Sequence, residues 1–231
     1  MVEDKKMYMN CAECKDRSCV NGNDCSVMRI EIKKKYTGED LKAMKIYADI
    51  EAKYYMMMNR LEELIMYAQM MGYKLLGLAF CEALCYEARI ISKILSNDFE
   101  VVSVCCTVCG INKNELNLPR RNDDSLSVEA TCNPIGQAEV LNKAGTQLNI
   151  LLGLSVGHDA IFTKHSKAPV TTLAVKDRVF CHHPLLAIYS PYYLKTRYGI
   201  DEHGNKVNKA DAQEEEEVKK KYGKLENRLV K

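Results

Sequence analysis

Tryptophan is absent from this 231-residue chain, and only four phenylalanines and five prolines occur. The sequence contains no run of about eighteen apolar residues, so we expect no transmembrane helix. The first residues, Met-Val-Glu-Asp-Lys-Lys, lack an apolar signal core, which argues against export. A formal net charge of +2 does not indicate a nucleic-acid or membrane surface. We therefore expect a cytoplasmic protein with neither nucleic acid nor membrane as a partner.

The usual nucleotide-binding signatures are also missing. No Gly-x-Gly-x-x-Gly segment follows an expected strand, and no Walker-type Gly-x-x-x-x-Gly-Lys-Ser/Thr segment is present. The pair Gly153 and Gly157 is weak evidence on its own. The sequence therefore disfavours a nucleotide-dependent enzyme.

Cysteine, in contrast, is plentiful, with eleven residues. An odd number of cysteines, in a chain that is 47% hydrophobic and has no signal segment, argues against a disulfide framework. In a reducing cytosol the same thiols are available to bind metal or to take part in redox chemistry.

Four cysteines lie close together near the amino terminus: Cys11, Cys14, Cys19 and Cys25, separated by two, four and five residues. Their polar neighbours cannot build a core, so a metal bound by thiolates would supply the folding energy. Zinc ribbons usually carry two Cys-x-x-Cys pairs and this segment has one, so the uneven spacing fits an iron–sulfur cluster, such as [4Fe–4S], at least as well as zinc. The alternative is four free thiols in a disordered arm.

A long helix is expected next, between Thr37 and Gly72. Apolar residues recur at alternating spacings of four and three, which is typical of one helix face: Ile50, Tyr54, Met57, Leu61, Leu64, Ala68 and Met71. We interpret this segment as one continuous helix that covers a face of the following sheet.

The stretch from Tyr73 to Cys109 predicts a strand, a helix and a second strand. The strands, at 74–80 and 99–104, are apolar runs that end at Cys81 and Cys105. A unit of this length normally forms a parallel, right-handed crossover. Because ligands bind beyond the carboxyl ends of parallel strands, both thiols would lie where a ligand site is expected.

The remaining elements extend this pattern. Asn133 and Pro134 open a helix that Gly145 closes, and apolar runs at 148–154 and 170–175 predict two more strands. We therefore predict an α/β fold with a mainly parallel, Rossmann-like sheet and flanking helices. The expected divisions are a four-cysteine metal-binding module at 1–30, an α/β domain with a long N-terminal helix at 31–195, and a charged tail or helix at 196–231.

Reactive side chains follow each expected strand, which suggests a catalytic site. Cys132 precedes a helix N-terminus, which stabilises a thiolate and lowers its pKa, so it is a candidate nucleophile with His158 as base and Asp159 as orienting group. Lys176 or Arg178 could pair with a small anionic ligand. The full sets are Cys132, His158, Asp159 and Lys176 as catalytic candidates, and Cys105, Asn133, Asp177 and Arg178 as cofactor-binding candidates.

Two other interpretations of these residues stay open. Cys81, Cys105 and Cys132, with His158, could hold a second metal centre and support redox or metal-dependent catalysis with a redox partner. Alternatively, the protein is a non-catalytic carrier or sensor of a metal or cluster. Cys85 and Cys106 are interpreted as buried structural residues, because free cysteine often behaves as a small hydrophobic side chain.

Three segments carry a resemblance: Cys-Asn-Pro-Ile-Gly-Gln-Ala-Glu-Val-Leu-Asn at 132–142, Gly-Leu-Ser-Val-Gly-His-Asp at 153–159, and Ala-Pro-Val-Thr-Thr-Leu-Ala-Val-Lys-Asp-Arg at 168–178. Together with Cys11, Cys14, Cys19 and Cys25, they resemble a family of uncharacterised, cysteine-rich, predicted metal-binding proteins of archaea and anaerobic bacteria. The resemblance runs from about residue 11 to 189 and implies metal binding, with no assigned reaction.

The chain departs from that family pattern in two ways. Ser155 stands where the family motif implies a cysteine, and this chain carries additional thiols at 106, 109 and 181. A metal centre that depends on position 155 would therefore need Cys109 or Cys181 as a substitute.

Overall fold

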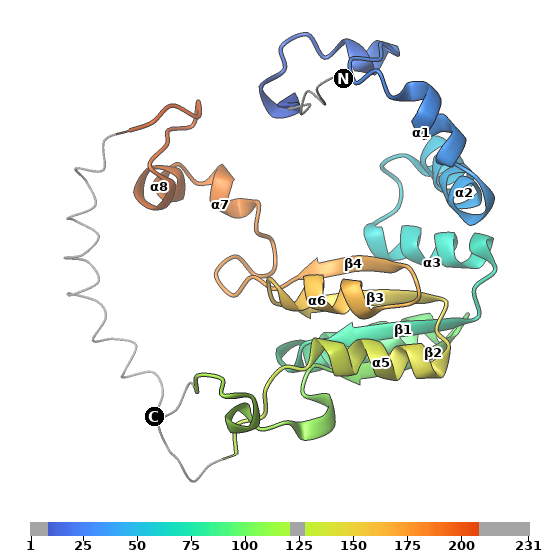
Figure 1. The fold of residues 1–231 in the computed structure, drawn as a ribbon, viewed down its shortest axis with the longest axis vertical. Coiled ribbons are helices and arrows are strands. Elements are labelled where there is room, and N and C mark those ends of the chain that lie inside the picture. Colours follow the sequence, from blue (N-terminus) through green and yellow to red (C-terminus); the bar gives the residue numbers. More distant parts are fainter. Residues whose placement is uncertain (1–8, 121–127, 208–231) are drawn as a thin grey trace, which may run out of the picture. The chain divides into compact units, whose positions relative to one another are not determined.

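The computed structural model describes residues 9–120 and 128–207. The chain divides into two compact units, an amino-terminal unit, Met1–Asn59, and a sheet unit, Arg60–Lys231 (Figure 1). Each unit is described by itself. No helix among the described residues has both the length and the apolar character needed to cross a bilayer.

The amino-terminal unit is helical, with only Ile46 and Ile50 buried among its described residues. Its two 3-10 turns each contain a cysteine, and two α-helices follow. The elements are η1 (Cys11–Glu13), η2 (Ser18–Asn21), α1 (Arg29–Lys35) and α2 (Gly38–Tyr54).

The prediction of one continuous helix from Thr37 to Gly72 is wrong. Helix α2 ends at Tyr54, and a second helix, α3, begins only at Arg60. Met56 has a positive φ of 57°, a left-handed conformation that interrupts helical hydrogen bonding. Its side chain is 90% exposed and that of Met57 75% exposed, so no packing supports a helix there. The apolar spacing in the sequence continues across the break, although the helix does not.

The described part of the sheet unit contains four strands, and all neighbouring strands are parallel in the order β2-β1-β3-β4. They are β1 (Leu75–Phe80), β2 (Glu100–Cys105), β3 (Leu148–Leu154) and β4 (Val170–Val175). The central strand β3 is buried along its whole length, whereas the edge strands are partly exposed. Continuous apolar runs are typical of strands covered on both faces. The predicted α/β fold with a parallel sheet is confirmed.

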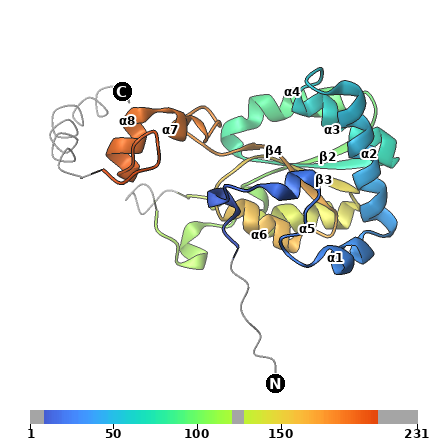
Figure 2. The same ribbon diagram turned by 90° about the horizontal axis from the view of Figure 1, so that it is seen from above.

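Helices cover both faces of this sheet. Figure 2 shows α3 (Arg60–Met71) and α4 (Cys85–Leu95) on one face, with α5 (Pro134–Ala144) and α6 (His158–His165) on the other. The second half of the expected long helix, α3, therefore covers the sheet as predicted. The remaining short helices are η3 (Glu82–Leu84), η4 (Val108–Gly110), η5 (Lys113–Leu116), α7 (Leu186–Tyr189), α8 (Pro191–Tyr193) and the π-helical η6 (Leu194–Tyr198).

Gly77 in β1 has no space for a side chain. A Cβ atom at Gly77 would lie 2.1 Å from Asn149 Oδ1 and 2.8 Å from Leu141 Cδ1. Asn149 is fully buried, and its Oδ1 accepts a hydrogen bond from Thr146 Oγ1 at 2.8 Å. The polar side chain of β3 therefore occupies the space that a side chain at Gly77 would need.

The strand order also locates the expected ligand site. The chain leaves β1 through α4 toward β2, and leaves β3 through α6 toward β4, so the connections from the two central strands run to opposite edges. Ligands in open parallel sheets bind outside the carboxyl ends of the strands at such a switch point. Cys81 follows β1 and Ser155 follows β3 at this point.

The charged tail or helix expected at 196–231 falls mostly outside the described residues, since nothing after Val207 is described. Its first part contains the end of η6 and a turn in which Ile200 pairs with Lys206.

Candidate functional site

Four cysteines occupy the carboxyl ends of β1 and β2 and the start of α5. Cys81 follows β1, Cys105 ends β2, Cys106 comes next, and Cys132 lies two residues before α5 begins. In the sheet, Phe80 pairs with Cys105, so the first two thiols sit at the ends of neighbouring strands. All four are free thiols; Cys106 is buried and the other three are half-buried. We call these four residues the rim thiol group.

Hydrogen bonds to the backbone hold the parts of this group together. The Asn133 amide donates to the Cys106 carbonyl at 2.7 Å, which joins the start of α5 to the end of β2. Gln137 Nε2 donates to the carbonyls of Phe80 at 3.1 Å and Val104 at 2.8 Å. Because Phe80 and Val104 directly precede Cys81 and Cys105, the Gln137 amide ties both strand ends to α5.

The side chains that make these bonds are fixed by their own surroundings. Gln137 is only 1% exposed, and its Oε1 atom has no hydrogen-bond partner among the described residues. Asn133 caps α5 by accepting from the Gly136 amide at 2.8 Å, and its Nδ2 donates to the Val108 carbonyl. The helix start that carries Cys132 is therefore anchored to the segment after β2.

The thiols of Cys106 and Cys132 influence each other's ionisation. Hydrogen bonding by the Cys106 thiol is the largest influence that lowers the pKa of Cys132, to about 7; burial opposes it. The same bond and burial raise the pKa of Cys106, so Cys106 keeps its proton. The Glu82 amide donates to Cys106 Sγ at 3.4 Å, and this bond and the Cys81 thiol oppose the rise in the pKa of Cys106.

Charged groups also act on Cys132 from further away. Lys113, in η5, lowers the pKa of Cys132, while negative charge on Cys81 or Cys105 would raise it. The Lys113 ammonium also contacts Glu129 Oε1 at 2.6 Å. The ionisation of Cys132 is therefore influenced by one cation as well as by the other rim thiols.

Sequence reasoning attributed a lowered pKa of Cys132 to its helix terminus, and the structure adds the thiol of Cys106 as a cause. The buried position expected for Cys106 is confirmed, whereas its part in the thiol group was missed. The prediction that Cys85 is buried is wrong: it is exposed at the first position of α4, whose buried residues are Ala88 and Leu95.

Neither substitute expected for the thiol missing at Ser155 belongs to the rim thiol group. Cys109 and Cys181 are both exposed, with positive φ angles of 71° and 49° in turns. Cys106 instead supplies the additional thiol beside Cys132. In the sequence, only the position of Cys106 directly after Cys105 could have indicated that Cys106 belongs to this group.

His158 and Asp159 lie where β3 leads into α6, as expected, but they do not act on each other. Asp159 Oδ1 accepts from the backbone amides of Gly157 at 3.0 Å and Ala160 at 2.8 Å. The carboxylate therefore stabilises the first turn of α6, and no hydrogen bond among the described residues joins it to the His158 ring. A catalytic role for these two residues stays a prediction.

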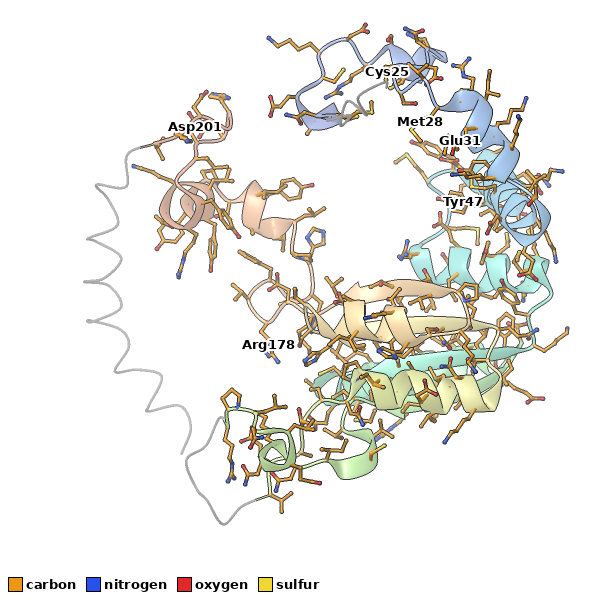
Figure 3. The ribbon with its side chains drawn as sticks, viewed as in Figure 1. Cys25, Met28, Glu31, Tyr47, Arg178 and Asp201 are labelled. Carbon is orange, nitrogen blue, oxygen red and sulfur yellow. The ribbon has the colours of Figure 1, made fainter. Side chains whose placement is uncertain are left out.

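The candidates after β4 lie at the far edge of the sheet, with β3 between them and β1. The Lys176 amide donates to the Leu154 carbonyl at 3.1 Å, and Asp177 Oδ1 accepts from the amides of Val179 and Phe180. Arg178 lies in the turn that follows β4 (Figure 3). Their proposed contacts with an anionic ligand stay predictions.

The four amino-terminal thiols are more exposed than the rim thiol group. Cys11, Cys14, Cys19 and Cys25 are all exposed and free, and Cys25 lies in the loop before α1 (Figure 3). The Arg17 amide donates to Cys14 Sγ at 3.4 Å. Across the described ranges, no group of three or more His, Cys, Asp or Glu side chains is placed so that it could hold a metal ion. The second metal centre near Cys81, Cys105 and Cys132 likewise stays a prediction.

Comparison with known proteins places the chain in a family. A family model described as "Protein of unknown function (DUF1847)" matches residues 19–173. The chain belongs to this family. The matched region includes β1, β2, β3, the first part of β4 and the rim thiol group, together with Cys19 and Cys25.

A protein of Methanocaldococcus jannaschii is similar over most of the chain. It is named "Uncharacterized protein MJ0455" and is 50% identical over 189 residues, which cover 81% of this chain and 97% of that protein. No solved structure matches the chain. The expected membership of an uncharacterised, cysteine-rich family with an archaeal relative is confirmed.

Proposed function

We propose that this is a metal-binding protein in which Cys11, Cys14, Cys19 and Cys25 hold zinc or an iron–sulfur cluster, with the rim thiol group as a separate site of thiol chemistry. The observation that supports metal binding is the lack of a core in the amino-terminal segment. None of the residues from 9 to 37 is buried. Ordering a residue costs about 1–2 kcal/mol, and this segment buries no apolar surface that would offset the cost.

The chemistry of the four donors fits either type of centre. Four thiolates are the common ligand set of structural zinc and of iron–sulfur clusters. The Arg17 amide donates to Cys14 Sγ, and hydrogen bonds to the ligand sulfurs are a common feature of iron–sulfur centres. The turns at η1 and η2 bring a cysteine into each of two short helical segments.

Metal binding in this segment would be coupled to its folding. The described thiols do not form a ready ligand group, and sites of this kind rarely exist before the metal binds. The proposal therefore requires the metal to draw the four sulfur atoms together and to order the chain between them.

Elemental analysis of anaerobically purified protein tests this proposal, with a visible spectrum to separate an iron–sulfur cluster from colourless zinc. Replacement Cys14→Ser should remove most of the bound metal. Cys85→Ser is the matched control, because Cys85 is also an exposed free thiol but lies in the sheet unit. Full metal content in Cys14→Ser would refute the ligand assignment.

The same analysis separates a catalyst from a carrier or sensor. A single centre that is lost with Cys14→Ser, together with inert rim thiols, favours the non-catalytic role. A second, labile metal that survives Cys14→Ser, or reactive rim thiols, favours redox or metal-dependent catalysis.

A further inference from the structure

Two members of the rim thiol group, Cys106 and Cys132, are far apart in the sequence but are linked through the backbone. The amide of Asn133, the residue after Cys132, donates to the Cys106 carbonyl at 2.7 Å, and neither cysteine forms a disulfide. Cys106 is 5% exposed, whereas Cys132 is half-buried and so has an open side. One partner is thus accessible to a reagent from solvent and the other lies behind it.

The backbone brings the two cysteines close together. The bond from the Asn133 amide to the Cys106 carbonyl joins the two segments one residue after Cys132. The Cα atom of Cys132 therefore lies within one residue of this link, and a disulfide spans Cα separations of roughly 4.4–6.8 Å. The Gln137 tether to both strand ends prevents the two segments from separating.

We infer that Cys132 and Cys106 form a redox-active dithiol that reduces disulfide substrates and becomes an internal disulfide. This activity goes beyond metal binding and does not depend on it. Cys132 is the attacking residue because it is the accessible member, and Cys106 is the resolving residue because it is buried behind it. The lowered pKa of Cys132 agrees with this division of roles.

The reaction balances with a disulfide, R–S–S–R, as the oxidant. The Cys132 thiolate attacks one sulfur, forms a mixed disulfide and releases R–S⁻. Cys106 then gives its proton to the released R–S⁻, and its sulfur attacks Cys132 Sγ and displaces the second R–S⁻. The protein loses two electrons and one proton, the substrate is reduced to R–SH and R–S⁻, and a Cys106–Cys132 disulfide is formed.

The test uses the reduced, full-length protein and the aromatic disulfide 5,5′-dithiobis(2-nitrobenzoate) as the probe. After one equivalent of probe, the remaining thiols are alkylated and the tryptic peptides are analysed by mass spectrometry. Trypsin should release Cys132 alone in peptide 122–143 and Cys106 in peptide 94–113, which also contains Cys105 and Cys109. The expected product is a cross-link between these two peptides.

Three variants assign the roles. Cys106→Ser should stop at the mixed disulfide on Cys132 and release one equivalent of thiolate at this site instead of two. Cys132→Ser should give no cross-link, and Cys109→Ser, in the same peptide as Cys106, should leave it unchanged. A circular dichroism melt confirms that each variant is folded.

The inference is overturned if the cross-link persists in Cys106→Ser, which would assign the pairing to Cys105 or Cys109, or if Cys132 in the folded protein reacts no faster than the exposed Cys85. Metal content reports separately on the amino-terminal proposal. Cys106→Ser should retain its metal there, so the failure of one proposal leaves the other standing.

Discussion

The two groups of thiols in this protein are organised in opposite ways. In the amino-terminal unit, four cysteines lie within fifteen residues of one another in the sequence, yet they are exposed and form no ready ligand group in the described residues. At the sheet rim, cysteines separated by up to about fifty residues are brought into contact by strand pairing and by Asn133 and Gln137. The cysteines that are close in the sequence therefore form no single group in the described structure, whereas the distant cysteines of the rim do.

This difference shows which interactions supply the free energy that holds each group of thiols in place. The rim thiol group is held by the packing and hydrogen bonds of the sheet unit, so its geometry exists without any ligand. The amino-terminal thiols have no such support, so a bound metal would have to supply it. Each of the following predictions tests one side of this contrast.

The largest effect is expected from metal removal. Zinc binding to small thiolate sites is worth about 10–16 kcal/mol at pH 7, so a chelator should abolish hydrogen-exchange protection in residues 9–37. The sheet unit should melt at the same temperature with or without chelator. Unchanged protection in residues 9–37, or a large fall in the melting temperature of the sheet unit, would contradict the claim that only the amino-terminal segment depends on a metal.

Replacement Gln137→Leu should destabilise the sheet unit by about 2 kcal/mol, because two hydrogen bonds to buried carbonyls are lost at roughly 1 kcal/mol each. Denaturant unfolding measures this loss. Gln147→Leu is a matched control, since Gln147 Oε1 accepts from the amides of Lys74 and Leu75 at the opposite end of β1. Only Gln137→Leu should also slow formation of the Cys106–Cys132 disulfide, while neither variant should lose metal.

The rate of Cys132 alkylation should rise with pH and level off above a midpoint of about 7, because only the thiolate reacts. In Cys106→Ala, which removes the hydrogen bond that most lowers the pKa of Cys132, the midpoint should move to higher pH. The rate at pH 7 should then fall by up to about fivefold, since the loss of thiolate outweighs the gain in intrinsic nucleophilicity. An unchanged midpoint would contradict the hydrogen bond between these thiols.

The smallest effect is expected for Lys113→Gln. Lys113 lowers the pKa of Cys132 through its charge alone and less strongly than Cys106, and it is shared with Glu129. The alkylation midpoint should rise by less than in Cys106→Ala, and the difference should shrink in high salt because salt screens the interaction. If the midpoint rose by more than in Cys106→Ala, then Lys113 and not Cys106 would be the main cause of the lowered pKa of Cys132.

Much of the fold could be predicted from the sequence because each element carries a local signal. The apolar runs at 148–154 and 170–175 became β3 and β4 at the same bounds, and Asn133 with Gly145 closed the two ends of α5. The helix break at Met56 carried no such signal, since no proline or glycine marks it and the apolar spacing continued through it.

The candidate site could be predicted only in part. That Cys81 and Cys105 end neighbouring strands follows from the strand–helix–strand pattern, whereas the contact between Cys106 and Cys132 does not. It depends on where the loop between them returns and on the bond from Asn133 to the Cys106 carbonyl. Cys85 was misplaced for a related reason, because the exact phase of a helix face is set by its packing partners.

The sequence by itself determined the class of fold, the order of strands and helices, and the abundance of thiols, because periodicity and helix-capping residues act over a few neighbouring residues. Only the tertiary structure decided which thiols meet. Gln137 and Asn133 join segments that are distant in the chain, and the interaction between the Cys106 and Cys132 thiols shifts the pKa values of two chemically identical side chains in opposite directions.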